Sequence, residues 1–172
     1  MKFHLTKKVQ TKIKLKELYS IESKSDIKFL NEWYVNLFML DRKKYFIFTE
    51  SKTLFSVVED SKGINDKESF DSSIIKIIGK SFKLAGYEIS VDKKNILKIE
   101  YCKTENKGVL GSQVDLIYMA KAQVWHNGNY DFKRINETPM SYIGYKFPIE
   151  MFREEMDKML NSIEIEEEKE ET

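Results

Sequence analysis

Three apolar, β-prone runs that lie close together constrain the fold of this chain most. Nearly every residue in 33–40 is apolar, the charged tetrapeptide 41–44 interrupts the pattern, and residues 45–48 resume it. Runs of this kind are typical of strands covered on both faces, and the charged interruption predicts a hairpin turn. A third run at 54–58 follows closely. We therefore predict a three-stranded antiparallel meander.

Capping patterns and helical periodicity add helices to this meander. Asn65 with Glu68 has the spacing of a capping box, and Gly86 is a typical stop for the helix that they open. Ser112 with Asp115 repeats the capping-box spacing. We predict helices over residues 6–18, 66–85, 112–125 and 148–163, and short strands over 2–5, 87–91 and 97–101, the last two joined by a turn at 92–95.

These elements indicate an α+β fold. We expect an antiparallel sheet built around the meander, with the helices packed mainly on one face. A chain of 172 residues is long enough for one hydrophobic core and too short for two ordinary domains. We therefore expect a single α+β domain over residues 1–165. Residues 166–172 are almost all glutamate and are expected to form an acidic tail.

The charges are balanced overall but unevenly placed. The formal net charge is only +1, yet the first sixteen residues hold six lysines and no acid. Such runs are ordinarily solvated surface, and the functional alternative is a surface that faces an anionic partner. A single cysteine, Cys102, and the absence of a secretion signal or a membrane-length apolar run predict a cytoplasmic protein that does not bind membranes.

Four short motifs resemble a known family. They are Trp33-Tyr34-Val35-Asn36-Leu37, Thr53-Leu54-Phe55-Ser56, Val109-Leu110-Gly111-Ser112 with Asp115, and Asn136 with Thr138-Pro139-Met140-Ser141. Together they resemble a bacterial family of domains of unknown function, numbered sixty-nine thirty-three. The resemblance implies a bacterial cytoplasmic protein and no known activity.

The central motif departs from that family. The resemblance leads us to expect an Arg-Ser pair before the valine and a Met-Asn pair after the serine, where this chain has Lys107-Gly108 and Gln113-Val114. Lys107 keeps the positive charge, but lysine does not reproduce the bidentate binding of arginine. A ligand site built on the expected arginine and asparagine would therefore be lost or altered here.

The candidate catalytic residues do not form a recognised set. Ser112 and Asp115 have the spacing of a helix cap, and a nucleophilic serine would also need a base. The two histidines, His4 and His126, stand in no metal-ligand or catalytic motif. We therefore predict no metal site and no cofactor.

Binding candidates rest on charge and on helix starts. Residues 108–112 have two readings: a tight turn, or glycine-rich backbone that offers N–H groups to an anion beside Lys107. Arg42 lies beside Lys43 and Lys44 at the predicted hairpin tip, where it is either solvated or part of a basic patch with Lys52 and the N-terminal lysines. The candidate binding residues are Arg42, Lys107, Gly111, Ser112, Asp115 and Asn136.

The sequence leaves two possible functions, a binding module and an enzyme. The first is a non-catalytic interaction module of a mobile-element, phage or toxin–antitoxin-like system, whose partner is a protein or another anionic macromolecule. The alternative is an enzyme that acts on a phosphate-bearing or nucleic-acid substrate, with Lys107, Gly111, Ser112 and Arg42 in its site. Convergence of the candidate residues on one concave pocket would favour the enzyme, and dispersal would favour binding.

Overall fold

The helices and strands alternate along a mixed sheet. The computed structural model describes residues 1–18, 28–91, 98–129 and 131–170, of which 164–170 are described as backbone only. In chain order the elements are β1 (Lys2–Leu5), α1 (Lys7–Lys12), β2 (Glu32–Leu40), β3 (Lys43–Glu50), β4 (Ser56–Asp60), α2 (Lys67–Ala85), β5 (Glu100–Lys103), α3 (Lys107–Asn127), the short 3-10 helices η2 (Phe132–Glu137) and η3 (Ser141–Ile143), and α4 (Pro148–Glu170).

The strands of the described chain form one sheet in the order β4-β3-β2-β1-β5. β2, β3 and β4 make the predicted antiparallel meander, but β1 runs parallel to both of its neighbours, β2 and β5. The prediction of an antiparallel sheet is therefore wrong, because the sheet is mixed. Strand direction here depends on long crossover connections. The residue pattern within one short strand does not indicate how the chain connects that strand to its neighbours, so it does not predict the strand's direction.

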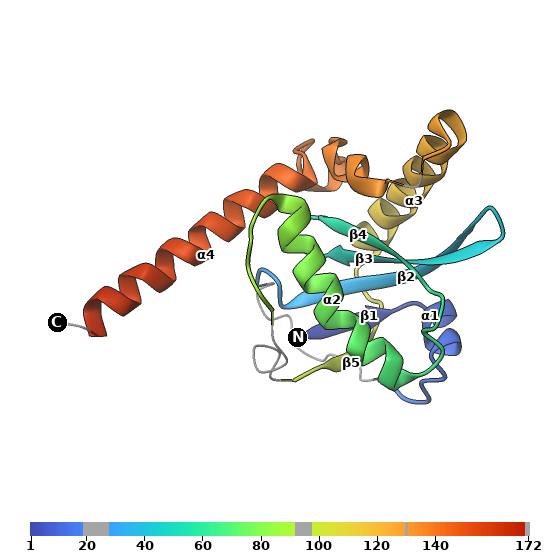
Figure 1. The fold of residues 1–172 in the computed structure, drawn as a ribbon, viewed down its shortest axis with the longest axis horizontal. Coiled ribbons are helices and arrows are strands. Elements are labelled where there is room, and N and C mark those ends of the chain that lie inside the picture. Colours follow the sequence, from blue (N-terminus) through green and yellow to red (C-terminus); the bar gives the residue numbers. More distant parts are fainter. Residues whose placement is uncertain (19–27, 92–97, 130, 171–172) are drawn as a thin grey trace.

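Both faces of the sheet are covered. Trp33 and Phe48 belong to a core beneath α2 and the start of α4, whereas their neighbours Tyr34 and Ile47 belong to a second core beneath α3 and η2. Adjacent strand residues point to opposite faces, so each apolar run supplies both cores. The predicted two-sided coverage of the hairpin is confirmed, and the prediction that the helices pack mainly on one face is wrong. Figure 1 shows α2 lying across the sheet.

A two-residue turn joins β2 to β3. Asp41 and Arg42 both take left-handed conformations, with φ of 46° and 63°. Two successive residues of this kind match the primed turns, whose twist suits a tight hairpin. The predicted hairpin is confirmed, and its register runs from Leu40 opposite Lys43 to Trp33 opposite Glu50.

The first helix is much shorter than the predicted 6–18. α1 ends at Lys12, Ile13 closes it, and Lys14 has a left-handed φ of 55°. Thr6 precedes α1 without capping it, because the Thr6 hydroxyl donates to Asn36 Oδ1 on β2 at 3.1 Å. The helix that follows β1 therefore has fewer than two turns. Because α1 is so short, it lies beside only part of β2.

The later helices agree better with the sequence. α2 lies within one residue of the predicted 66–85, although its capping box is Asp66 with Ser69, one place after the predicted pair. α4 begins at Pro148, as predicted, and continues to Glu170, past the expected end at 163. Figure 1 shows α4 extending away from the sheet.

The region after α2 differs from its prediction. Residues 87–91 are not a strand, and β5 spans Glu100–Lys103 where the sequence predicts 97–101. The predicted turn at 92–95 and the first residue of the second strand lie outside the described residues. No helix within the described ranges is long and apolar enough to cross a membrane.

Candidate functional site

The six candidate residues predicted from the sequence lie in three different parts of the structure. Arg42 is exposed at the hairpin tip, and Asn136 is buried in η2. The other four candidates share α3, where Ser112 is buried and Lys107, Gly111 and Asp115 are exposed.

The glycine-rich stretch before the predicted cap is helix and not loop. α3 begins at Lys107, and Asn106 caps it: Asn106 Oδ1 accepts from the N–H groups of Gly108 at 2.9 Å and Val109 at 3.1 Å. Ser112 lies in the second turn and donates its hydroxyl to Gly108 O at 2.9 Å. The predicted capping box of Ser112 with Asp115 is therefore wrong, and these N–H groups already have a partner.

Gly108 has a packing role that explains one glycine of this stretch. A Cβ atom built on Gly108 would lie 2.1 Å from the ring of Tyr142. The Tyr142 hydroxyl also accepts from Asn106 Nδ2 at 2.8 Å. Only glycine lets this ring lie against the start of α3, and the contact fastens η3 to the helix.

Asn136 completes the outer edge of the sheet. Its Oδ1 accepts from Ser56 N–H at 2.7 Å, and its Nδ2 donates to Ser56 O at 2.8 Å. The side-chain amide thus pairs with both main-chain groups of one residue of β4, which is an edge strand. Asn136 is 2% exposed, and losing a buried pair of this kind costs about 1–3 kcal/mol.

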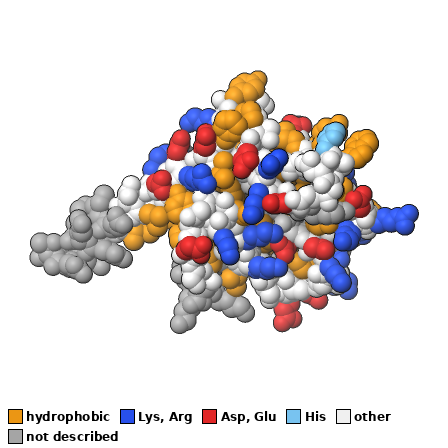
Figure 2. Space-filling model, turned by 45° about the horizontal axis from the view of Figure 1, so that its top comes forward, with side chains coloured by type: hydrophobic (Ala, Val, Ile, Leu, Met, Phe, Trp, Pro, Cys, Tyr) orange, Lys and Arg blue, Asp and Glu red, His pale blue; other side chains and the backbone are white. Residues whose placement is uncertain are grey.

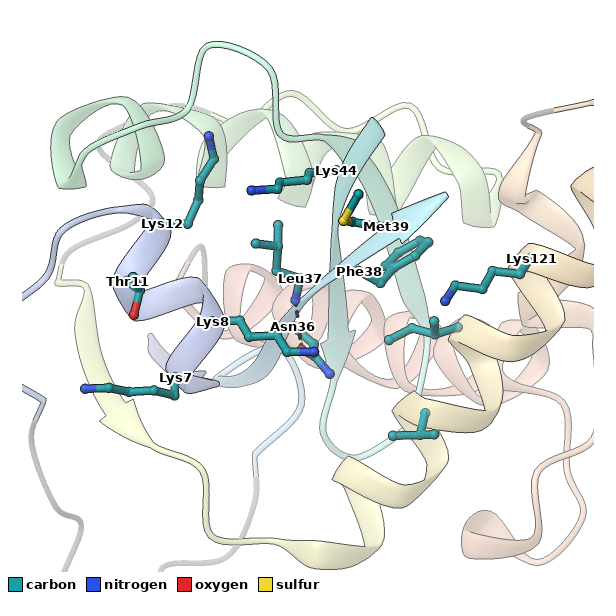
Figure 3. Close-up of a pocket in the computed structure, with 12 residues that line it drawn as sticks. Lys7, Lys8, Thr11, Lys12, Asn36, Leu37, Phe38, Met39, Lys44 and Lys121 are labelled. Carbon is teal, nitrogen blue, oxygen red and sulfur yellow. Dashed lines mark hydrogen bonds between the residues drawn. The ribbon is translucent and has the colours of Figure 1, made fainter. Parts of the chain in front are cut away.

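A cavity lies where β2 extends beyond β1. β1 pairs with β2 only as far as Leu5 opposite Val35, and the chain then enters α1. Residues 36–40 of β2 pair with β3 alone among the described strands. A cavity of about 760 Å³ opens there, between α1, the second half of β2 and α3 (Figure 3). None of the six candidate residues lines this cavity.

Lysine supplies all the charge around the cavity, which we call the lysine groove. Lys7 and Lys12 donate to the neutral side chains of Gln10 at 3.3 Å and Asn65 at 2.5 Å. Within the described chain, none of the groove lysines forms an ion pair with a carboxylate. The groove lysines are Lys7, Lys8 and Lys12 on α1, Lys44 on β3 and Lys121 on α3.

The floor of the lysine groove is apolar. Two of its apolar side chains are largely exposed, Met39 at 55% and Val114 at 59%. Neighbouring apolar side chains of this size are usually covered. Phe38 also lines the groove, but its ring is stacked on Tyr45 and is 6% exposed. In Figure 3, Lys8 reaches from α1 toward Asn36, while Lys12 and Lys44 lie together on the other side of Leu37.

The positive surface continues past the groove. A second cavity of about 500 Å³ shares Lys12 and Lys44 with the groove and adds two lysines and one acid, Lys43, Lys62 and Asp60. On the far side, α3 presents Tyr118 and Trp125, which are 76% and 88% exposed. Figure 2 shows a face on which exposed hydrophobic side chains lie between charged ones.

A buried polar cluster lies elsewhere on the sheet. His4 stacks on Tyr34, and its Nδ1 lies 2.8 Å from Lys103 O, which can only accept, so Nδ1 carries a proton. His4 Nε2 faces the Glu32 carboxylate at 3.5 Å. Burial raises the pKa of the neighbouring Cys102 thiol to about 11, which disfavours a thiolate nucleophile. The described residues contain no group of three metal-ligating side chains.

Sequence reasoning found part of the lysine groove. The lysine-rich N-terminus indicated an anionic partner, and Lys7 and Lys8 belong to the groove. Lys44 is one of the two lysines beside Arg42 at the hairpin tip, which the sequence offered as part of a basic patch. Lys121 was missed because only the tertiary fold brings α3 near α1. The sequence did contain one indication of this site. Val114 lines the groove, and it stands where the family resemblance predicts asparagine.

The chain is similar to a known protein family. A family model described as a domain of unknown function, DUF6933, matches residues 2–151. The curated proteins contain no match to the chain.

Proposed function

Since the chain belongs to the domain-of-unknown-function family DUF6933, as the sequence predicted, we propose its function from its surface. The protein is a non-catalytic interaction module that binds an anionic macromolecule in the lysine groove. This proposal keeps the role expected from the sequence, in the cytoplasm and within a mobile-element, phage or toxin–antitoxin-like system. The partner's charge, and not a bound cofactor, is what the groove recognises.

The observation that carries the proposal is the charge of the groove. Five lysines surround it, and none is neutralised by a carboxylate in the described chain. Like charges held close together repel one another, so an arrangement without neutralising partners favours an anionic ligand. The apolar floor adds area that gains free energy when a partner covers it.

Three findings support binding over the enzyme alternative. Residues 108–112, for which an anion-binding loop was one of two readings, are helix, and the side chain of Asn106 already accepts from the N–H groups of Gly108 and Val109. The six candidate residues do not converge on the lysine groove. Among the described residues that line the groove there is no carboxylate, histidine or cysteine to act as a base or nucleophile.

Charge reversal within the groove tests the proposal. The probes are fluorescein-labelled heparin and poly-L-glutamate, and the measurement is fluorescence anisotropy at rising salt. We expect salt-sensitive binding by the wild-type protein, and a loss of about tenfold or more in the variant Lys8→Glu, Lys44→Glu, Lys121→Glu. The matched control, Lys28→Glu, Lys103→Glu, Lys133→Glu, changes the net charge equally at exposed positions outside the groove and should bind nearly as wild type.

Two results would overturn the proposal. One is failure of the wild-type protein to bind either polyanion at low salt. The other is an equal loss of affinity in the two variants, because affinity would then depend on net charge and not on the groove. Circular dichroism of both variants checks that they remain folded.

A further inference from the structure

We propose that the partner inserts an extended acidic segment of a protein into the lysine groove, where it adds as a strand to the open half of β2. This inference rests on the proposed function and names the partner class and its binding mode. Strand addition uses main-chain hydrogen bonds for affinity and alternate side chains for specificity. The lysine groove has both features.

The main-chain groups of β2 face the groove at alternate residues. Glu32 O accepts from Ser51 N–H on the side of β3, whereas Val35 O accepts from Thr6 N–H on the side of β1. Main-chain direction alternates along a strand, so Leu37 and Met39 point the same way as Val35. Beyond Leu5 no residue of β1 remains to meet them.

Three of the four main-chain groups of Leu37 and Met39 are open in the described part of the chain. Leu37 N–H is satisfied only by its neighbour, since Asn36 Oδ1 accepts from it at 2.8 Å. Among the described residues, none hydrogen-bonds to Leu37 O or to either main-chain group of Met39. An edge of this kind is a template for another strand unless charge or bulk blocks it.

An added strand would lie between two different walls. α1 packs with the core on one face of the sheet through Val9, and α3 packs with the core on the other face through Leu116. Successive side chains of the added strand would point to these walls in turn. Residues toward α1 would meet Lys8 and Lys12, and residues toward α3 would meet Val114 and Ile117. A strand that alternates acidic and apolar residues fits both walls.

The floor favours a protein over a nucleic acid. Proteins that hold single-stranded nucleic acid place aromatic rings where bases can stack. In the groove, Leu37, Met39, Val114 and Ile117 are aliphatic, and the ring of Phe38 is already stacked on Tyr45. The lysines protect the open edge against pairing with an uncharged strand, and they select an acidic one.

The test uses a labelled peptide of alternating glutamate and valine. Two comparison probes have the same charge: the same peptide N-methylated at one glutamate and the adjacent valine, which blocks both of its edges, and an oligothymidylate. We expect the parent peptide to bind most tightly. The N-methylated peptide should bind about tenfold or more weakly, because two or more main-chain hydrogen bonds are lost.

A matched pair of variants tests the same edge from the protein side. Met39→Pro removes the N–H that faces the groove, and proline is tolerated where this group is not part of a ladder. Met39→Ala removes the side chain and keeps the N–H. Met39→Pro should weaken binding of the parent peptide more than Met39→Ala does. In wild-type protein, the Met39 amide should exchange more slowly with deuterium when the peptide is bound.

The outcomes separate this inference from the proposed function. Equal affinity for the parent and N-methylated peptides, with lysine-dependent binding retained, overturns strand addition and leaves the binding module standing. Tighter binding of the oligothymidylate overturns the choice of a protein partner. Self-association in sedimentation that Met39→Pro abolishes would identify the occupant as a second copy and also overturn it. Loss of all lysine-dependent binding overturns both.

Discussion

Two glycines in the first turns of α3 have opposite surroundings. Gly108 meets the ring of Tyr142, whereas a Cβ atom on Gly111 would meet nothing within 4 Å. Both appear in the same short sequence, for which the sequence offered a tight turn or an anion-binding loop. The difference between them comes from Tyr142, which is distant in the chain and is brought to α3 by η3.

Replacing each glycine with alanine should therefore change stability in opposite directions. Alanine favours a helix interior over glycine by about 1 kcal/mol, so Gly111→Ala should raise the free energy of unfolding by about 0.5–1 kcal/mol. Gly108→Ala should lower it by about 1–3 kcal/mol, because the new methyl group overlaps an aromatic ring. Urea denaturation measures both changes.

A second-site change controls for this explanation. Gly108→Ala should be less harmful in a Tyr142→Ala background, since the ring that it overlaps is gone. If Gly108→Ala destabilises both backgrounds equally, the Tyr142 contact is not the reason that glycine occupies this position.

At the scale of elements, α4 combines a docked half with an acidic end. Phe152 is fully buried, and its ring lies 4.3 Å from that of Phe55 and 5.0 Å from that of Phe29, measured between centroids. Ile163 is 44% exposed, and glutamate dominates the sequence after Ile165. Among the described side chains of α4, Phe152 and Met156 are fully buried, and both lie in its first half.

We predict that residues 166–172 are dispensable for folding. Deleting them should leave the thermal midpoint within a few degrees of the wild type, because they bring no apolar face. Phe152→Ala provides the contrast and should cost about 3–5 kcal/mol. A large fall in the midpoint of the truncated protein, measured by circular dichroism, would contradict a domain boundary at 165.

The elements also show what sequence reasoning can reach. The meander, α2 and the start of α4 were predicted because hydrophobic period, turn residues and caps agree there. α1 was predicted too long because its apolar spacing continues past Lys12, while the left-handed Lys14 leaves no mark in that spacing. The start of α3 was missed because two glycines conceal it, although Asn106 is a strong cap. These two helices border the lysine groove on either side of β2.

At the scale of the molecule, the junction between α2 and α4 responds to alkaline pH. The Tyr87 hydroxyl donates to Asp157 Oδ1 at 2.6 Å. Burial, together with this hydrogen bond and the Asp157 charge, raises the pKa of Tyr87 from 10.0 to about 12. The folded state thus holds the Tyr87 proton more tightly than the unfolded state does. The stabilisation that the protonated Tyr87 hydroxyl gives to the folded state is complete below pH 10, and it is lost as pH rises toward 12.

We predict that Tyr87→Phe flattens this part of the pH profile. The variant should be less stable than the wild type near about pH 8, and the difference should shrink near about pH 11, where the wild type has lost part of the contribution. Urea midpoints at the two pH values measure it. A difference that is unchanged or larger at the higher pH would show that Tyr87 contributes through packing alone.

The position of β1 between β2 and β5 has a consequence for how the chain folds. β1 lies at residues 2–5, and its second neighbour, β5, lies at 100–103. On the ribosome, the first strand must therefore wait for most of the domain to emerge before its second edge is paired. Sequence-distant pairing of this kind raises contact order and slows folding. Among the described strand pairs, β1 with β5 therefore closes the longest stretch of chain.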